Sequence, residues 1–111
     1  MEKSMKKGEV VVLPFPFSDL SAAKKRPALI VATLDGDDVI CCQITSEARL
    51  DTYALVLNNS DFQDGSLPQT SMVRPNRLFT AEKSIILYKA GLLTEKKMKE
   101  VEEVLVTIFT D

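Results

Sequence analysis

Three consecutive cationic residues, Lys24, Lys25 and Arg26, directly precede Pro27 in this sequence. Neighbouring like charges repel one another, so such a cluster favours a partner of opposite charge. A guanidinium group binds phosphate oxygens through two parallel hydrogen bonds, whereas a lysine acts as a point charge. Pro27 also restricts Arg26 to extended backbone conformations. These residues predict an anion site centred on Arg26; the alternative is a solvated basic turn in which Arg26 pairs with a structural carboxylate.

A second group of polar residues follows an apolar stretch further along the chain. It contains the hydroxyl groups of Thr45 and Ser46, and Arg49 lies four residues after Thr45. Hydroxyl groups at the end of a strand can hold a phosphate oxygen, but they more often cap a turn by bonding to the backbone. The sequence leaves both roles open for Thr45.

A third group consists of Arg74, Asn76 and Arg77, and Pro75 interrupts it. Because proline cannot donate a backbone hydrogen bond, this segment is expected on an edge strand or at the exit of a strand. The two arginines could bind an anion, and ordinary surface charge is the alternative.

The composition restricts the chemistry that these residues could perform. The chain contains no histidine, which is the commonest metal ligand and the usual general acid or base. Its two cysteines, Cys41 and Cys42, are adjacent, so on a strand their side chains point to opposite faces and share neither a disulfide nor a metal ion. We therefore expect no metal site, no cofactor and no histidine-based nucleophile. One cysteine is expected to be buried and the other partly covered.

A predicted β-hairpin connects the first two groups of polar residues. Residues 27–33 (PALIVAT) form a nearly continuous apolar stretch, which is typical of a strand buried on both faces, and residues 39–45 (VICCQIT) form the return strand. Asp35 and Gly36 between them are typical of a tight turn. Two strands joined by a tight turn run antiparallel, so Arg26 and Thr45 are expected at the same end of the hairpin.

The rest of the chain predicts further strands and one helix. Strands are expected over residues 9–13, 52–57, 70–74 and 84–88, and loops over residues 18–25 and 58–68. Thr94 is a good N-cap for a helix that extends to about residue 109. The apolar residues of this helix form one stripe, consisting of Met98, Val101, Leu105 and Ile108. These elements predict a mainly β, α+β fold, in which a small, strongly curved antiparallel sheet or barrel packs on a C-terminal helix.

Length and composition fit one domain that spans residues 1–111. Hydrophobic residues make up 45% of the chain and charged residues 27%, which excludes wholesale disorder. No apolar stretch approaches the roughly 20 residues that span a bilayer, and the charged N-terminus lacks the features of a signal peptide. We therefore expect a cytoplasmic protein with no membrane attachment. The net charge of −2 argues against unselective coating of nucleic acid, but not against a local basic site.

Three segments of the chain resemble the MazF/PemK family of bacterial toxins. Residues 8–32 (GEVVVLPFPFSDLSAAKKRPALIVA) contain an opening glycine and strand, a PFPF segment, a loop and an RPALIV strand, like the N-terminal signature of that family. Residues 43–46 (QITS) resemble its second motif, an apolar strand that ends in threonine. A strand with hydroxyl and arginine residues (TSMVR), a late strand and a C-terminal helix follow in the family's order. The resemblance covers nearly the whole chain and is most specific over residues 8–46.

This resemblance implies a fold, an activity and a set of partners. The family has an SH3-like barrel fold, and its members are the toxins of type II toxin–antitoxin pairs. They are endoribonucleases that cut single-stranded RNA at short sequences without a metal ion. The substrate's 2′-hydroxyl attacks the adjacent phosphorus, which leaves a 2′,3′-cyclic phosphate and a 5′-hydroxyl. The toxins form homodimers, and a cognate antitoxin silences them by laying a disordered acidic tail across the RNA site.

The resemblance also implies roles for individual residues of this chain. Arg26 matches the family's catalytic arginine and would stabilise the charge that develops on the phosphate. Thr45 matches a catalytic-site threonine that would hold a phosphate oxygen. Arg74 matches an arginine that some members use as a general acid or electrostatic partner. The expected RNA-binding residues are Lys24, Lys25, Ser46, Arg49, Asn76 and Arg77.

Two departures from the family leave the proton transfers unassigned. Some members have a carboxylate where this chain has Asn76, and others have a glutamate or histidine in the loop before the first arginine. Asp19 is the only acid in that loop here, so it is the candidate general base. One alternative is a non-enzymatic protein on the same fold, either an inhibitor of a target such as DNA gyrase or a degenerate toxin that binds RNA without cutting it. A purely structural β-domain is the third hypothesis.

Overall fold

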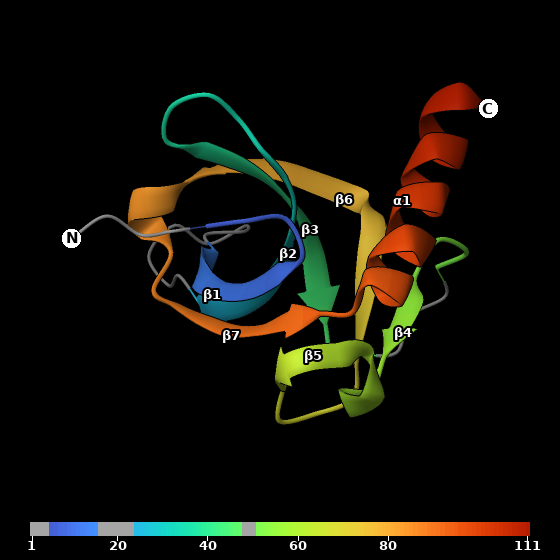
Figure 1. Cartoon of the computed structure of the whole chain (residues 1–111), viewed down its shortest axis with the longest axis horizontal. Coiled ribbons are helices and arrows are strands. Elements are labelled where there is room, and N and C mark those ends of the chain that lie inside the picture. Colours follow the sequence, from blue (N-terminus) through green and yellow to red (C-terminus); the bar gives the residue numbers. More distant parts are fainter. Residues whose placement is uncertain (1–4, 16–23, 48–50) are drawn as a thin grey trace.

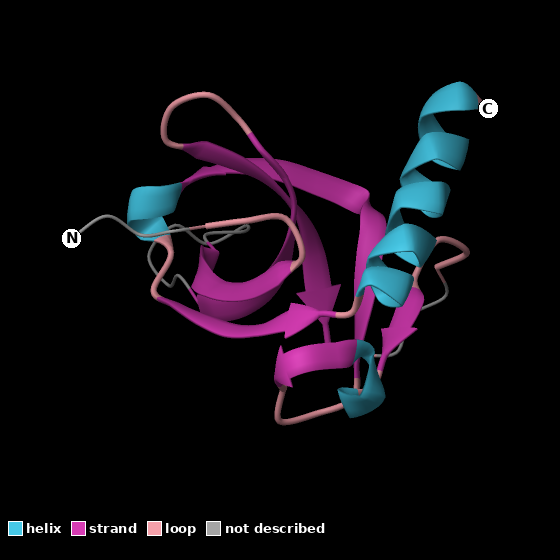
Figure 2. Ribbon diagram, viewed as in Figure 1, coloured by secondary structure: helices cyan, strands magenta, loops and turns pink. Residues whose placement is uncertain are grey.

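The computed structural model describes residues 5–15, 24–47 and 51–111 of the chain. Strands make up most of it, and the longest helix comes last (Figures 1 and 2). In chain order the elements are β1 (Glu9–Phe15), β2 (Lys24–Thr33), β3 (Asp38–Thr45), β4 (Leu55–Leu57), the 3₁₀ turn η1 (Asn59–Asp61), β5 (Phe62–Gly65), β6 (Ser71–Glu82), the 3₁₀ turn η2 (Lys83–Ile85), β7 (Tyr88–Leu93) and α1 (Glu95–Thr110).

The seven strands that the structure describes form one sheet, in the order β4-β6-β3-β2-β1-β7-β5. All neighbouring strands run antiparallel. The sheet curls round on itself, and α1 stands beside its β4–β6 edge (Figure 1). The prediction of a mainly β fold, with a strongly curved antiparallel sheet and a C-terminal helix, is confirmed.

The central hairpin forms as the sequence predicts. Gly36 has a φ of +90° in the turn between β2 and β3, a conformation that favours glycine. Ala28 pairs with Gln43, which places the start of β2 beside the end of β3. The predicted loop ends earlier than expected, because β2 already begins at Lys24 and pairs there with Phe15 of β1. The lysines therefore belong to a strand and not to a turn.

Alternating side chains of the curled sheet fill two separate hydrophobic clusters. Val10, Leu29 and Cys42 lie in a cluster that also contains Met98 and Val101 of α1. The second cluster contains the residues that alternate with these in the strands, namely Val11, Leu13, Ala28, Ile30, Val39, Cys41, Ala81 and Ile86. The strands β1, β2, β3 and β6 thus contribute to both clusters, as expected for strands buried on both faces.

The two adjacent cysteines show this alternation directly. Cys41 and Cys42 lie in different clusters, so the prediction of opposite faces is confirmed. The expectation that one of them is partly covered is wrong, because both are fully buried. Burial raises the pKa of each thiol to about 12, and the charge of Cys41 adds to the shift at Cys42. Both remain protonated and act as small hydrophobic side chains.

The C-terminal helix also follows the sequence pattern. The Thr94 side chain caps α1 by accepting a hydrogen bond from the Lys97 backbone N–H at 3.2 Å. Met98 and Val101 are buried, and Leu105 packs against the same cluster. Among the residues described, no helix combines the length and apolar character needed to cross a membrane.

The largest correction concerns β6. Pro75 was expected to mark an edge or an exit, but β6 continues through it to Glu82 and lies between β3 and β4. The register explains why this is possible: Gln43 of β3 pairs with Arg74, and Cys42 with Leu78. Residues 75–77 therefore form a bulge between consecutive partners, where a missing backbone donor does not interrupt the ladder.

Three further strand predictions change in extent. The predicted loop over residues 58–68 contains η1 and β5, and β4 covers only Leu55–Leu57 of the predicted 52–57 strand. The predicted 84–88 strand begins in η2, and β7 begins where that prediction ends, at Tyr88. Short edge strands have weak sequence patterns because one of their sides has no neighbour to pack against.

Candidate active site

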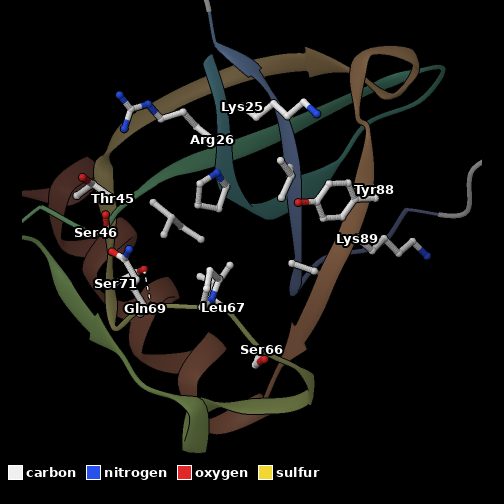
Figure 3. A pocket seen from close by; sticks show the side chains of 15 residues that line it. Lys25, Arg26, Thr45, Ser46, Ser66, Leu67, Gln69, Ser71, Tyr88 and Lys89 are labelled. Carbon is white, nitrogen blue, oxygen red and sulfur yellow. Dashed lines mark hydrogen bonds between the residues drawn. The ribbon is translucent and has the colours of Figure 1, made fainter. Parts of the chain in front are cut away.

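The residues predicted to do chemistry gather where β2 begins and β3 ends. Two hollows meet there and share Arg26, Ile44 and Thr45. The first, which we call the wide hollow, has a volume of about 540 Å³ and is lined by Val12, Lys25, Arg26, Pro27, Ile44, Thr45, Ser46, Ser66, Leu67, Pro68, Gln69, Ser71, Tyr88, Lys89 and Ala90 (Figure 3). The second, the arginine hollow, has a volume of about 230 Å³ and is lined by Arg26, Gln43, Ile44, Thr45, Glu47, Arg74 and Arg77.

Arg26 stands on the boundary between the two hollows. Residues alternate in direction along a strand, and Figure 3 shows the Lys25 and Arg26 side chains pointing to opposite sides of β2. The Nε atom of Arg26 is buried. The prediction that Arg26 and Thr45 lie at the same end of the hairpin is confirmed, since both residues line both hollows.

Thr45 has the turn-capping role that the sequence left open. Its side chain is largely buried, and Oγ1 accepts a hydrogen bond from the backbone N–H of Glu47 at 3.1 Å. This bond turns the chain away from β3 directly after the last strand residue. The hydroxyl hydrogen is still available as a donor, so capping and binding of a phosphate oxygen are compatible. Ser46 is exposed and lines the wide hollow.

Arg74 is held in place by a carboxylate that the sequence analysis did not include. Its Nε donates to Oδ2 of Asp51 at 2.8 Å, and the two side chains are 12% and 5% exposed. The alternative of ordinary surface charge is therefore wrong for Arg74. Burial alone would raise the pKa of Asp51, but hydrogen bonds from Arg74, the Tyr53 backbone and Asn76 outweigh it and lower that pKa.

The opposite wall of the wide hollow comes from β7 and from the segment that follows β5. Tyr88 is 56% exposed, and Figure 3 shows its hydroxyl pointing into the hollow. Lys89 points away and pairs with Glu9, with Nζ 2.8 Å from Oε2. Ser71 Oγ donates to the carbonyl of Gln69 at 3.0 Å and so fixes the segment that enters β6.

The predicted site residues do not all come together. Arg26, Thr45, Arg74, Arg77, Lys25 and Ser46 line one or both hollows. Lys24 lies on β2 and Asn76 beside Asp51, but neither lines a hollow. Asp19 and Arg49 lie outside the described residues.

Sequence reasoning missed three residues of this region. Glu47 could have been found, because it follows Thr45 and Ser46 directly and a residue just after a strand stays close to the strand end. Tyr88 was placed at the end of a strand but not recognised as a hollow-lining aromatic residue. Asp51 gave no signal, since its partner Arg74 is 23 positions away in the sequence.

This arrangement is chemically suited to an anion. Three arginines and one threonine hydroxyl line the arginine hollow, and arginine remains charged at any physiological pH. Across the ranges 5–15, 24–47 and 51–111, no group of three or more cysteine or acidic side chains could hold a metal ion. The fold and site together define a small curled β-sheet domain with a cationic site of the kind that binds phosphate groups.

The family follows from comparison with known proteins. Residues 6–109 match the family model of the PemK-like, MazF-like toxins of type II toxin–antitoxin systems. The chain therefore belongs to this toxin family. The sequence has no significant match among curated proteins.

Solved structures share the fold at low sequence identity. An endoribonuclease from a mycobacterial species, in complex with its cognate antitoxin, is similar with a TM-score of 0.74 and 22% identity over 96% of this chain and 95% of that one. MazF from Deinococcus radiodurans is similar with a TM-score of 0.74 and 18% identity over 99% and 100% of the two chains. The Mycobacterium tuberculosis toxin MazF-mt6 has a TM-score of 0.71 and 18% identity over 91% and 95%. These likenesses confirm the MazF-like fold.

Proposed function

We propose that this toxin-family chain is an endoribonuclease that cuts single-stranded RNA at a short sequence. The observation that carries the proposal is the meeting of Arg26 and Thr45 on the boundary of two hollows, with Arg74 and Arg77 beside them. A phosphodiester seated at this boundary would contact both residues, and the nucleotides on either side of it would extend into the two hollows. The solved relatives described as endoribonucleases support the same activity.

The proposed reaction needs little from the protein beyond orientation and charge. The nucleophile is the substrate's own 2′-hydroxyl, which attacks the adjacent phosphorus and displaces the 5′-oxygen. Arg26 would donate hydrogen bonds to the non-bridging oxygens as negative charge develops on them. The Thr45 hydroxyl would hold one of these oxygens, and Arg74, held by Asp51, would neutralise charge from the β6 side. The products are a 2′,3′-cyclic phosphate and a 5′-hydroxyl, and no step requires a metal ion or a cofactor.

The same cationic surface also supports the proposed regulation. An antitoxin with a disordered acidic tail could place carboxylates on Arg26 and Arg74, where the RNA phosphates would otherwise bind. Two of the solved structures of this fold contain MazE together with MazF. We further propose that the toxin acts as a homodimer in the cytoplasm, where its RNA substrate and its antitoxin are found.

The test is cleavage by the purified protein in EDTA. A single-stranded RNA should be cut at a defined sequence, and the new ends should carry a 2′,3′-cyclic phosphate and a 5′-hydroxyl. A substrate with a 2′-deoxynucleotide at the cleavage position should bind but remain intact, because it lacks the nucleophile. Cleavage of that deoxy substrate, or activity that appears only when a divalent cation is added, would contradict the proposed chemistry.

One observation favours a second candidate function, a toxin that binds its target without cutting. Asp51 accepts hydrogen bonds from both Arg74 and Asn76, so the residues at two family proton-transfer positions are engaged by a buried carboxylate. A protein of this kind would bind RNA, or a protein target such as DNA gyrase, with the same cationic surface. Intact RNA together with relaxed plasmid in expressing cells would support the gyrase version.

A further inference from the structure

The arginine hollow contains one carboxylate that has no role in the function described so far. Among the described residues, Glu47 is the single acidic residue that lines either hollow. The other charged residues of the arginine hollow are Arg26 from β2 and Arg74 and Arg77 from β6. Glu47 thus lines the same hollow as three arginines, at whose boundary the scissile phosphate would bind.

The backbone holds Glu47 in this position. β3 ends at Thr45, and the Glu47 backbone N–H donates to Thr45 Oγ1 at 3.1 Å. The hydroxyl that would hold a phosphate oxygen and the residue that carries the carboxylate therefore belong to one hydrogen-bonded turn. Glu47 is exposed, so a substrate bound in the hollow can reach it.

Among the described residues, the arginines that line the arginine hollow and Asp51, which is bonded to one of them, are unsuitable as proton acceptors. Asp51 is 5% exposed, its Oδ2 is bonded to Arg74, and its pKa is lowered. Arginine cannot give up its proton in a protein. The Cys41 thiol is fully buried, with a pKa raised to about 12. Asn76, which stands where some relatives have a carboxylate, has no ionisable group.

We propose that Glu47 is the general base of the RNA cleavage reaction. The inference deepens the proposed endoribonuclease function and rests on it. One carboxylate oxygen of Glu47 takes the proton of the 2′-hydroxyl while the 2′-oxygen forms a bond to phosphorus. The bond between phosphorus and the 5′-oxygen breaks, and that oxygen leaves with the electron pair and takes a proton from water. Glu47 then returns its proton to solvent, so the enzyme is unchanged after each turnover.

The residues around Glu47 are suited to hold a substrate beside its carboxylate. Arg26, Arg74 and Arg77 line the arginine hollow together with Glu47, and they would bind the phosphate whose adjacent 2′-hydroxyl must lose a proton. A base that acts on this hydroxyl must lie within hydrogen-bond reach of it, beside the phosphate and not behind it. Glu47 is suited to this position because it lines the same hollow as Thr45, the proposed phosphate ligand, and its backbone N–H is bonded to the Thr45 side chain.

The experiment compares Glu47→Gln with the wild-type protein and with Glu103→Gln, an exposed substitution on α1 outside both hollows. Single-turnover cleavage of RNA is measured in EDTA as a function of pH, and binding is measured with RNA that carries a 2′-deoxynucleotide at the cleavage position. Glu47→Gln should cut at least about 100-fold more slowly, because general base catalysis contributes about 10²–10⁴-fold. If Glu47 is the base, the wild-type rate should fall at acidic pH, and the rate of Glu47→Gln should not show this fall. Binding of the deoxy substrate should be unchanged or tighter, which shows that the variant is folded.

Each outcome separates the two proposals. If the wild type and Glu103→Gln cut RNA and Glu47→Gln cuts within threefold of them, the assignment of Glu47 is overturned and the endoribonuclease function stands. If neither the wild type nor either variant cuts RNA, both proposals fail together. If Glu47→Gln loses cleavage and loses binding of the deoxy substrate to the same extent, Glu47 is a binding or structural residue and not a base.

Discussion

The two hollows share a wall but differ in what they offer a substrate. The arginine hollow is lined by arginines from β2 and β6, by uncharged residues of β3 between them, and by Glu47 just beyond β3. The wide hollow is lined on its far side by Leu67, Pro68, Tyr88 and other residues with apolar or hydroxyl-bearing side chains. The first is suited to the phosphodiester and its proton transfers, and the second to the flat faces of nucleotide bases. The difference indicates that chemistry and sequence selection are separate tasks, joined at Arg26.

The hollows also differ in how their walls are held. The arginine hollow is built on inner strands, and the largely buried pair with Asp51 fixes the guanidinium group of Arg74 beside the bulge of β6. The wide hollow depends on the segment after β5, at the edge of the sheet. Gly65 holds this segment with a φ of +74° and lies against the Ala90 backbone. Substitutions should therefore affect the arginine hollow through charge and the wide hollow through shape.

The largest effect is expected at the shared wall. Arg26→Ala should lower kcat/KM for RNA by about 10³-fold, because it removes the main donor to the charge that develops on the phosphate. Arg26→Lys should recover only part of the loss, since lysine keeps the charge but not the two parallel hydrogen bonds. The measurement is steady-state cleavage of one RNA by all three proteins. Near wild-type activity in Arg26→Ala would contradict the assignment of Arg26.

The contact between β5 and β7 at the edge of the wide hollow should be the most sensitive to an added side chain. A Cβ at Gly65 would lie 2.2 Å from the Ala90 carbonyl oxygen, so Gly65→Ala must displace β5 from β7. We expect a loss of about 3 kcal/mol in the free energy of unfolding, measured by urea denaturation. The matched control is Gly36→Ala, which also has a positive φ but no atom within 4 Å of the added Cβ. It should cost only the backbone strain, about 1 kcal/mol, and equal losses in the two variants would contradict this explanation.

The contribution of the Arg74–Asp51 ion pair to the free energy of unfolding should depend on pH. Asp51→Asn should lower the free energy of unfolding by about 2 kcal/mol at neutral pH, because it removes the charged partner of a buried arginine. The folded-state pKa of Asp51 lies below its ordinary value of 3.8. Its contribution is therefore present above that value and lost as the pH falls through the folded-state pKa. Urea denaturation between neutral and acidic pH should show the free energies of unfolding of the wild type and Asp51→Asn converging as the pH falls. A difference that stays constant with pH would contradict this role of Asp51.

The smallest effect is expected from the aromatic side of the wide hollow. Tyr88→Ala should raise KM about tenfold with little change in kcat, because it removes a surface for base stacking that is remote from the phosphate. Tyr88→Phe keeps the ring and should behave almost like the wild type. A fall in kcat without a change in KM would instead place Tyr88 in the chemical step.

Much of the scaffold could be predicted from local patterns. The continuous apolar stretches, the Asp35–Gly36 turn and the Thr94 cap gave the central hairpin and the helix within a few residues of their observed ends. A tight turn also forces its strands to run antiparallel, so Arg26 and Thr45 could be paired from the sequence alone. These features depend on residues that are close together in the chain, so the sequence pattern predicts them directly.

The sequence by itself determined the hairpin, the helix and the residue types available for catalysis, because periodicity, turn residues and composition are local properties. Only the tertiary structure decided that β6 passes through Pro75, that Asp51 holds Arg74, and that Arg74 and Arg77 line one hollow with Arg26. Each of these depends on strand register and on contacts between residues from separate elements. The basic cluster could thus be recognised from its residues, whereas Asp51, the carboxylate that holds Arg74, could be recognised only from the folded sheet.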